Sequence, residues 1–253
     1  MKISIVTPVL NQAAFLERTI RSVLDQRGEF ELEHLVVDGG STDGTLEILR
    51  RYADRLRWLS EPDTGQSDAI NKGLRLVNGD VLAWLNADDL YLPGALAHVA
   101  AEWRHTSFAW AFGNCRIINA ADVEIRRGIT AYKIWQSRGY SYRRLLRRNF
   151  IPQPAVFFSR AAYEQVGELD RDLTYAMDYD YWLRLGRRWC PRYVDHFLAA
   201  FRWHPRSKTG AAYRAAAWET FQVARRHAAG GSRLDLCWHF MHYCTLCVLY
   251  RFL

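Results

Sequence analysis

Two adjacent aspartates, Asp88 and Asp89, follow the apolar run at residues 81–85, and Asn86 stands two positions before the first of them. Neighbouring carboxylates repel each other, so a cation or several hydrogen-bond donors must hold them. Divalent metal ions prefer carboxylate oxygens and leave part of their coordination shell to water or to a substrate phosphate. The alternative is that the pair caps a helix that begins near Pro93.

A second pair of acidic residues, Asp178 and Asp180, opens a segment in which Tyr181, Trp182 and Leu185 recur at helical spacing. An aspartate in the first turn of a helix can cap that helix, and it can also accept a proton as a general base. The two roles are compatible, because the helix N-terminus holds the carboxylate in place and tends to keep it ionised.

Strand-length apolar runs and helical segments alternate over the first hundred residues. The apolar runs cover residues 3–7, 34–37, 56–59 and 80–85, and the segments with helical spacing cover residues 13–26, 43–53 and 66–77. This βαβαβαβ order predicts an α/β fold with a mostly parallel, Rossmann-like sheet and helices on both faces. Such sheets bind ligands at the carboxyl ends of their strands.

Polar stretches follow each of the four apolar runs. They are Thr7 with Pro8, DGGSTDGT from Asp38, EPDTGQSD from Glu61, and NADD from Asn86. Because the strands are expected to be parallel, these stretches should converge on one edge of the sheet. This position favours a metal site at the paired aspartates over helix capping.

The second half of the chain is less regular. Apolar runs at 108–112 and 155–159, and a hairpin in CRIINAADVEIRR, predict added strands of mixed direction, whereas residues 178–189 and 211–229 are expected to be helical. We therefore expect one domain over residues 1–210, with a regular half (1–105) and a less regular half (106–210). Residues 211–253 would form a C-terminal helical extension.

Composition restricts the class of partner. The formal net charge of +7 and the isoelectric point near 9.3 favour an anionic partner, but no nucleic-acid-binding motif is present, so nucleic acid is not expected. Five cysteines do not suggest a disulfide framework and favour a reducing compartment. Neither a signal peptide nor a spanning helix is recognisable, so we expect the protein in the cytoplasm or at the cytoplasmic face of the membrane.

The segments TPVLNQAAFLERTIRSVLDQ, VVDGGSTDGT, GQSDAINKGL, GDVLAWLNADDLYLPGAL and DYDYWLRL occur in this order. Together they resemble the inverting family 2 glycosyltransferases of the GT-A fold, over about residues 1–210. The resemblance implies that residues 1–105 are the nucleotide-sugar half of the domain and residues 106–210 the acceptor half. The resemblance implies transfer of a sugar, with inversion, from a metal-bound nucleoside diphosphate sugar. The acceptor would be a hydroxyl of a glycan or of a lipid-linked oligosaccharide.

The resemblance assigns donor contacts by position. Thr7 and Pro8 would border the nucleotide, and Asp38 would accept a hydrogen bond from the imide N–H of uracil or thymine, as in a UDP- or dTDP-sugar. Asp68 would contact the donor. Lys72 is a weaker candidate, because a solvated position on a helix also explains it.

The NADD segment corresponds to the DxD motif of the family. Asp88 would bind the metal ion, Mn²⁺ or Mg²⁺, that bridges to the diphosphate, and Asp89 is a second candidate ligand. Asn86 replaces the first aspartate of the motif and would contact the ribose, with Ala87 beside it. This departure removes one negative charge, so metal binding would be weaker or would depend more on Asp89.

Four further residues would complete the donor site. His204 corresponds to a histidine that reaches the metal or the diphosphate in this family, although a lone histidine is more often structural. Arg206 and Lys208 are candidate phosphate contacts, and a solvated loop explains them equally well. Gln153, held between two prolines, would bind the donor or acceptor sugar.

The resemblance makes Asp178 the general base, with Asp180 as the alternative. Met177 replaces the glutamate that usually precedes this base, and together with Asn86 it leaves a non-catalytic nucleotide-sugar or glycan binder as one rival. A sugar-nucleotide pyrophosphorylase is another, but it should carry a Gly-rich, Arg-containing loop where this chain has TPVLNQAAF.

Residues 233–253 combine a narrow polar stripe with otherwise apolar side chains. The stripe consists of Asp235, His239, His242 and Thr245. Zinc binding by Cys237, His239, His242, Cys244 and Cys247 is not expected, because these side chains do not share one helix face. The segment is expected to contact a membrane or a partner, or to cover the core of the domain.

Overall fold

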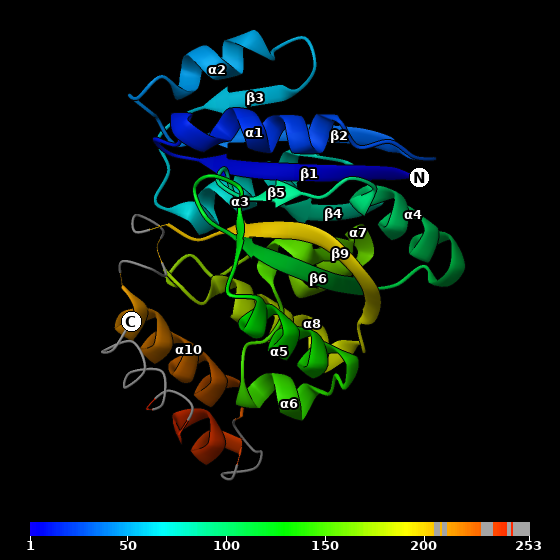
Figure 1. The fold of residues 1–253 in the computed structure, drawn as a ribbon, viewed down its shortest axis with the longest axis vertical. Coiled ribbons are helices and arrows are strands. Elements are labelled where there is room, and N and C mark those ends of the chain that lie inside the picture. Colours follow the sequence, from blue (N-terminus) through cyan, green and yellow to red (C-terminus); the bar gives the residue numbers. More distant parts are fainter. Residues whose placement is uncertain (205–207, 209–211, 229–234, 242–243, 245–253) are drawn as a thin grey trace.

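In a computed structural model, the strands form one mixed sheet with helices on both faces (Figure 1). The structure describes residues 1–204, 208, 212–228, 235–241 and 244. The strands are β1 (Lys2–Val9), β2 (Glu31–Asp38), β3 (Arg57–Ser60), β4 (Val81–Trp84), β5 (Leu90–Tyr91), β6 (Trp110–Ile118), β7 (Glu124–Ile125), β8 (Val156–Ser159) and β9 (Arg192–Arg202).

The helices follow the expected alternation in the first half and are more varied in the second. They are α1 (Ala13–Leu24), α2 (Thr45–Arg51), α3 (Gln66–Leu76), α4 (Ala95–Thr106), α5 (Arg127–Arg138), α6 (Tyr142–Arg147), α7 (Arg160–Val166), α8 (Met177–Arg188) and α10 (Tyr213–His227), with a short 3₁₀ turn η1 (Gln153–Ala155). In the part of the chain that the structure describes, no helix is both long and apolar enough to cross a bilayer.

The sheet has the strand order β3-β2-β1-β4-β8-β6-β9-β5, and β7 forms a hairpin with β6. Strands β1 to β4 are parallel to one another, whereas β8 runs antiparallel between β4 and β6. The parallel first half and the mixed second half of the expected α/β fold are therefore confirmed.

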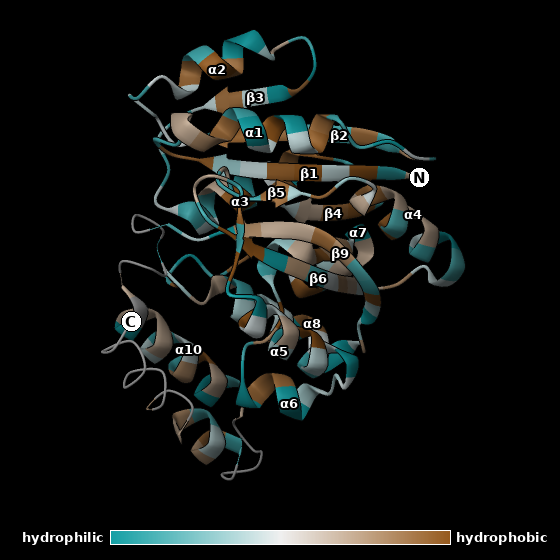
Figure 2. Cartoon of the chain, in the orientation of Figure 1, coloured by the Kyte–Doolittle hydropathy of each residue, from teal (hydrophilic) through white to brown (hydrophobic). Residues whose placement is uncertain are grey.

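Strand β1 is buried continuously from Ile3 to Val9, which means that both faces of the sheet are covered there. Neighbouring residues Ile5 and Val6 of β1 point to opposite sides, and Ile5 packs with the α4 residues Leu96 and Val99, whereas Val6 packs with the α3 residue Ile70. Figure 2 shows the apolar strands between helices whose outer surfaces are hydrophilic. Because helices cover both faces of the sheet, a ligand is expected to bind at the carboxyl ends of the parallel strands.

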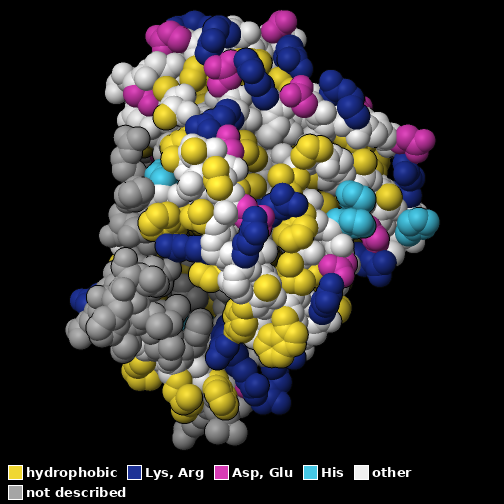
Figure 3. Space-filling view, in the orientation of Figure 1, with side chains coloured by type: hydrophobic (Ala, Val, Ile, Leu, Met, Phe, Trp, Pro, Cys, Tyr) yellow, Lys and Arg dark blue, Asp and Glu magenta, His cyan; other side chains and the backbone are white. Residues whose placement is uncertain are grey.

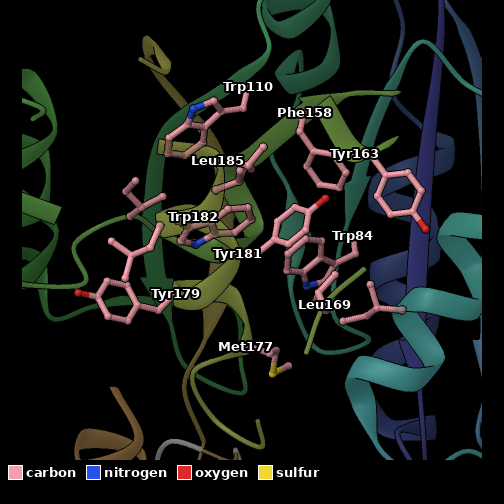
Figure 4. Close-up of a cluster of buried hydrophobic side chains, with 14 of the residues drawn as sticks. Trp84, Trp110, Phe158, Tyr163, Leu169, Met177, Tyr179, Tyr181, Trp182 and Leu185 are labelled. Carbon is pink, nitrogen blue, oxygen red and sulfur yellow. The ribbon is translucent and has the colours of Figure 1, made fainter. Parts of the chain in front are cut away.

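An aromatic cluster fixes helix α8 against the end of β4 (Figure 4). The rings of Trp84 and Trp182 stack with centroids 5.2 Å apart, and Trp110 stacks on the other side of Trp182 at 6.2 Å. Each fully buried aromatic side chain of this kind contributes roughly 2–3 kcal/mol. This packing sets the position of the first turn of α8, which carries Asp178.

Candidate functional site

Asp88 and Asp89 lie in the turn between β4 and β5, and their carboxylates have different surroundings. The Asp88 side chain is 19% exposed, whereas Asp89 is completely buried. Helix α4 begins only at Ala95, and its N-cap, Gly94, makes no side-chain cap hydrogen bond. The helix-capping interpretation of the two aspartates is therefore wrong.

The buried Asp89 carboxylate is engaged inside the protein. One oxygen accepts the backbone N–H of Arg202 at 2.8 Å, and the other accepts from the Asn86 side chain at 3.2 Å. Burial, together with the neighbouring charge of Asp88, raises the pKa of Asp89 well above its usual range. Since the Arg202 guanidinium also donates to the carbonyl of Asp88 at 2.7 Å, Asp89 ties the turn to strand β9 and does not face solvent.

His204 follows β9 and meets Asp88. Its Nε2 atom lies 3.1 Å from Oδ2 of Asp88, and its ring packs against Phe15 of α1 with centroids 5.0 Å apart. Within the described residues, no cluster of three or more His, Cys, Asp or Glu side chains forms a metal cage. Carboxylate and imidazole are both suitable ligands for Mn²⁺, so the pair fits an ion whose remaining ligands are phosphate oxygens and water.

Asn86 and Gln153, both expected at the sugar side, contact each other. The Asn86 amide donates to Gln153 Oε1 at 3.0 Å and accepts from Gln66 of α3 at 2.7 Å. Gln153 in turn donates to the carbonyl of Trp84 at 2.8 Å. These amides therefore connect the ends of β4, α3 and η1. Ala87, between Asn86 and Asp88, is buried, and its carbonyl accepts from Thr19 at 2.8 Å.

Asp38 ends β2 and is completely buried. Its carboxylate accepts from the N–H groups of Gly40 and Ser41, each at 3.1 Å, and from the hydroxyl of Ser60 at 2.6 Å. These bonds stabilise the DGGS turn.

Asp63 lies next to that turn and was not singled out from the sequence, although it belongs to the third polar stretch. It is half-buried, and a Cβ atom on Gly39 would collide with its Oδ2 atom, so the absence of a side chain at Gly39 makes room for this carboxylate. Its Oδ1 atom accepts the N–H of Gly65 at 2.9 Å. The edge beside β2 therefore carries two carboxylates, of which Asp63 is the more accessible.

Thr7 and Pro8 lie inside β1 and are buried, so the strand does not end with them. The Thr7 hydroxyl lies 2.9 Å from Nε2 of His34, and burial lowers the pKa of His34 to about 3, which keeps its ring neutral. The first loop at the edge instead begins near Asn11, whose side chain accepts the N–H of Thr42 at 2.8 Å.

Asp68 and Lys72, on α3, belong to one ion-pair network. The Lys72 ammonium lies 3.5 Å from Asp68 and 3.0 Å from Glu61, and Arg171 approaches Asp68 at 3.4 Å. Burial acts to raise the pKa of Asp68, but the N–H of Thr64 and these two cations hold it below its usual range. Lys72 is therefore ion-paired and not simply solvated.

The two aspartates of α8 differ as sharply as Asp88 and Asp89 do. Asp180 is bound by Arg184 and by His227 of α10, each at 2.8 Å. In the described part of the chain, the Asp178 side chain has no ion pair, and it accepts the N–H of Tyr179 at 2.6 Å. Burial raises the pKa of Asp178 to about 6, an effect that this N–H and the ammonium of Lys133 partly offset. The helix N-cap is Ala176, so neither aspartate is the cap.

Two contacts hold the segment that leads into α8. Glu219 of α10 accepts from the backbone N–H groups of residues 175 and 176, at 2.7 and 2.8 Å. Lys208 donates to the carbonyl of Thr174 at 3.3 Å. Arg206 lies outside the described residues.

The helical residues 235–241 turn their polar stripe towards the domain. Asp235 is buried between Arg143 and Arg147 of α6, at 3.1 and 2.6 Å, and the ring of His239 lies 2.9 Å from the carbonyl of Leu146. Cys237 and Cys244 are exposed, whereas residues 242, 245 and 247 lie outside the described ranges.

Comparison with known sequences places these motifs in a family. Residues 4–167 match the model of the family described as glycosyl transferase family 2. The chain is 31% identical over 215 residues to an uncharacterized protein of Mycobacterium tuberculosis, covering 79% of this chain and 66% of that protein. It is 35% identical over 188 residues to a PGL/p-HBAD biosynthesis glycosyltransferase of Mycobacterium bovis, covering 72% and 68%. The match thus spans about two thirds of these relatives' length.

Solved structures share the fold. Residues 1–349 of TarS from Staphylococcus aureus, in complex with UDP-GlcNAc, superpose with a TM-score of 0.66 at 17% identity, covering 92% of this chain and 74% of that one. The mannosyltransferase PcManGT from Pyrobaculum calidifontis, in complex with GDP-Man and Mn²⁺, gives a TM-score of 0.63 at 17% identity, covering 98% and 80%.

Proposed function

Because the chain belongs to glycosyl transferase family 2, we propose that it transfers a sugar, with inversion, from a nucleoside diphosphate sugar to a hydroxyl of a glycan or lipid-linked acceptor. One observation carries the proposal. Of the two adjacent carboxylates at the carboxyl end of β4, Asp89 is engaged internally, whereas Asp88 is partly exposed and held by His204. This leaves Asp88 as the carboxylate to which a metal-bound diphosphate has access.

Asp88 and His204 would hold the metal ion, Mn²⁺ or Mg²⁺. When bound, such an ion offsets the negative charge that develops on the diphosphate as it leaves. Arg202 and Asp89 keep Asp88 in place through the backbone. Asn86 and Gln153, which are hydrogen-bonded to each other, would supply amide groups to the ribose and the sugar.

Asp178 would act as the general base that removes the proton from the acceptor hydroxyl. Its pKa of about 6 suits proton abstraction near neutral pH, because the carboxylate is ionised there and still basic enough to accept a proton. Asp180 is less suited, because its ion pairs with Arg184 and His227 occupy both oxygens and hold its pKa low against the effect of burial.

The base of the donor would lie beside β2. The Asp38 carboxylate already accepts hydrogen bonds from three groups of the protein, whereas Asp63 is more accessible. We therefore assign the contact with the imide N–H of a UDP- or dTDP-sugar to Asp38 and Asp63 together. Peripheral contact with the membrane would suit a lipid-linked acceptor.

Calorimetric titration of UDP, dTDP and GDP, each with and without Mn²⁺, tests the proposal on the wild type, Asp88→Asn and the control Asp54→Asn, whose aspartate is exposed and lies after α2. We expect metal-dependent binding of one nucleotide that Asp88→Asn loses and Asp54→Asn keeps. Equal binding by the wild type and Asp88→Asn in Mn²⁺ would contradict the metal assignment.

A further inference from the structure

The positive charge of this protein is concentrated in one short segment. Residues 126–150 contain seven arginines, one lysine and no aspartate or glutamate. The whole chain has 34 Lys and Arg against 27 Asp and Glu, so outside this segment the basic residues are slightly outnumbered by the acidic ones. The net charge of +7 is therefore a property of α5, α6 and the loops that flank them.

Helix α5 exposes large apolar side chains among these charges. Ile129 is 45%, Tyr132 37% and Trp135 64% exposed, and their spacing of three residues places them on one side of the helix. Lys133, on the same helix, instead lies among Cys115, Thr130 and Pro152. The helix thus packs one side on the domain and presents an apolar, aromatic side to solvent.

Each arginine of the segment has a partner in the protein, but Arg126, Arg144 and Arg148 have no acidic one among the described residues. Arg126 stacks over Trp203, and ion pairs join Arg127 to Glu124, Arg138 to Asp195, and both Arg143 and Arg147 to Asp235. In the described part of the chain, no carboxylate pairs with Arg144 or Arg148. Arg144 lies over the ring of Trp135 and Arg148 over that of Tyr132, each at 5.9 Å from the ring centroid.

We propose that Ile129, Tyr132 and Trp135 of α5, with Arg144 and Arg148 of α6, form a basic aromatic face that docks on the surface of an anionic lipid bilayer. Figure 3 shows hydrophobic side chains next to Lys and Arg over α5. Trp and Tyr favour the interface between headgroups and acyl chains, and arginines without an acidic partner are attracted to anionic headgroups. This proposal does not depend on the transfer reaction.

A bilayer fits this face better than another polyanion does. Ile129 offers no flat ring for stacking with a base, and the exposed side chains form a convex helix surface, whereas single-stranded nucleic acid is usually held in a basic groove. An apolar side of a helix flanked by arginines matches the pattern of helices that lie in the membrane interface.

Co-sedimentation of the full chain with vesicles of phosphatidylcholine, with and without phosphatidylglycerol, tests the proposal. We expect binding only to the anionic vesicles, and Arg144→Gln/Arg148→Gln should weaken it about 30-fold at low salt, since each basic residue near such a surface is worth about a factor of five. The matched control is Arg50→Gln/Arg51→Gln on α2, which removes the same charge from two exposed arginines at the far end of the molecule (Figure 1).

Trp135→Ala measures how much the apolar side chains contribute to vesicle binding, separately from the arginines. Its loss of binding should persist at high salt, which screens the arginines but not the insertion of the ring. Donor titration calorimetry on each variant controls for folding. Three outcomes would overturn the proposal: equal vesicle binding by the two arginine double variants, no binding of the wild type to anionic vesicles, or binding of an RNA oligonucleotide in place of vesicles.

Discussion

At the scale of single residues, two pairs of acidic side chains divide their roles in the same way. In each pair one carboxylate is held inside the protein, Asp89 by Arg202 and Asp180 by Arg184 and His227. The other member, Asp88 or Asp178, keeps one oxygen without such a partner among the described residues. The internal carboxylate positions the turn or helix, and its neighbour is the candidate for chemistry.

We predict that Asp178→Asn abolishes transfer while donor affinity stays nearly unchanged, because the carboxamide cannot accept the proton of the acceptor. In the wild type, kcat should rise with pH through about 6, as Asp178 becomes ionised. Steady-state kinetics from pH 5 to 8 measure both effects. Substantial residual turnover of Asp178→Asn would move the base to Asp180.

The same substitution should also stabilise the protein near neutral pH. Since burial raises the pKa of Asp178 in the folded state, ionising this group opposes folding above pH 6 and has no effect below the unfolded value near 3.8. Asp178→Asn should therefore gain on the order of 2 kcal/mol at pH 8 and nothing at pH 3.5. Thermal denaturation at both values measures the difference.

Asp63 provides a second prediction at this scale. Asp63→Asn should weaken nucleotide binding by roughly tenfold, the worth of a hydrogen bond to a charged group, with an unchanged melting temperature. Asp38→Ala should instead lower the melting temperature, because the N–H groups of Gly40 and Ser41 and the hydroxyl of Ser60 lose their acceptor. If Asp63→Asn bound nucleotide like the wild type, the base contact would belong to Asp38 alone.

At the scale of elements, the first half of the fold could be predicted and parts of the second could not. The regular strand and helix periods over residues 1–85 gave β1 to β4 and α1 to α3 close to their observed bounds. Strand β9 was missed because buried and exposed residues do not alternate regularly along it. Its pairing with β6 also shifts register near Gly113 and Asn114. Helix α5 was missed because its apolar side chains point to solvent.

The site was predictable where it depends on motif position and not where it depends on long-range contacts. The order of the motifs singles out Asp88, Asp178 and His204 as candidates, and the structure brings Asp88 and His204 into contact. The burial of Asp89 could not be predicted, because it depends on the backbone of Arg202, 113 residues further along the chain. The contact between Gln153 and Asn86, 67 residues apart, is of the same kind.

Helix α10 also supports the candidate base, through Glu219. Its carboxylate accepts from the N–H groups of residues 175 and 176, just before α8 begins. We predict that Glu219→Ala lowers kcat and destabilises the protein by about 1–3 kcal/mol, with donor affinity kept, and that Glu219→Gln restores most of both. Steady-state kinetics, thermal denaturation and donor calorimetry measure these effects. Loss of donor binding by Glu219→Ala, with kcat and stability unchanged, would contradict the prediction.

At the scale of the whole molecule, the net positive charge is unevenly distributed. Ion pairs occur in both halves of the described chain, including the network around Asp68, whereas the excess of arginine lies on α5, α6 and the loops beside them. Residues 235–241 join the basic region through Asp235, which is the only acidic group paired with Arg143 and Arg147 in the described part of the chain.

Residues 233–253 could stabilise the domain by packing on it, or they could contact the membrane. Deletion of these residues distinguishes the two roles. Burial acts to raise the pKa of Asp235, but Arg143 and Arg147 hold it below its usual range, so the pair stabilises the fold above about pH 4 and less as pH falls below it.

We predict that the deletion lowers the melting temperature at pH 7 more than at pH 3, because it removes this ion pair and the contact of His239 with Leu146. It should also strengthen binding to anionic vesicles, since two more arginines beside the basic aromatic face lose their acidic partner. Asp235→Asn is the matched control and should reproduce the gain in vesicle binding with a smaller loss of stability. If residues 233–253 were instead the membrane contact, the deletion would release the protein from vesicles and leave its stability unchanged.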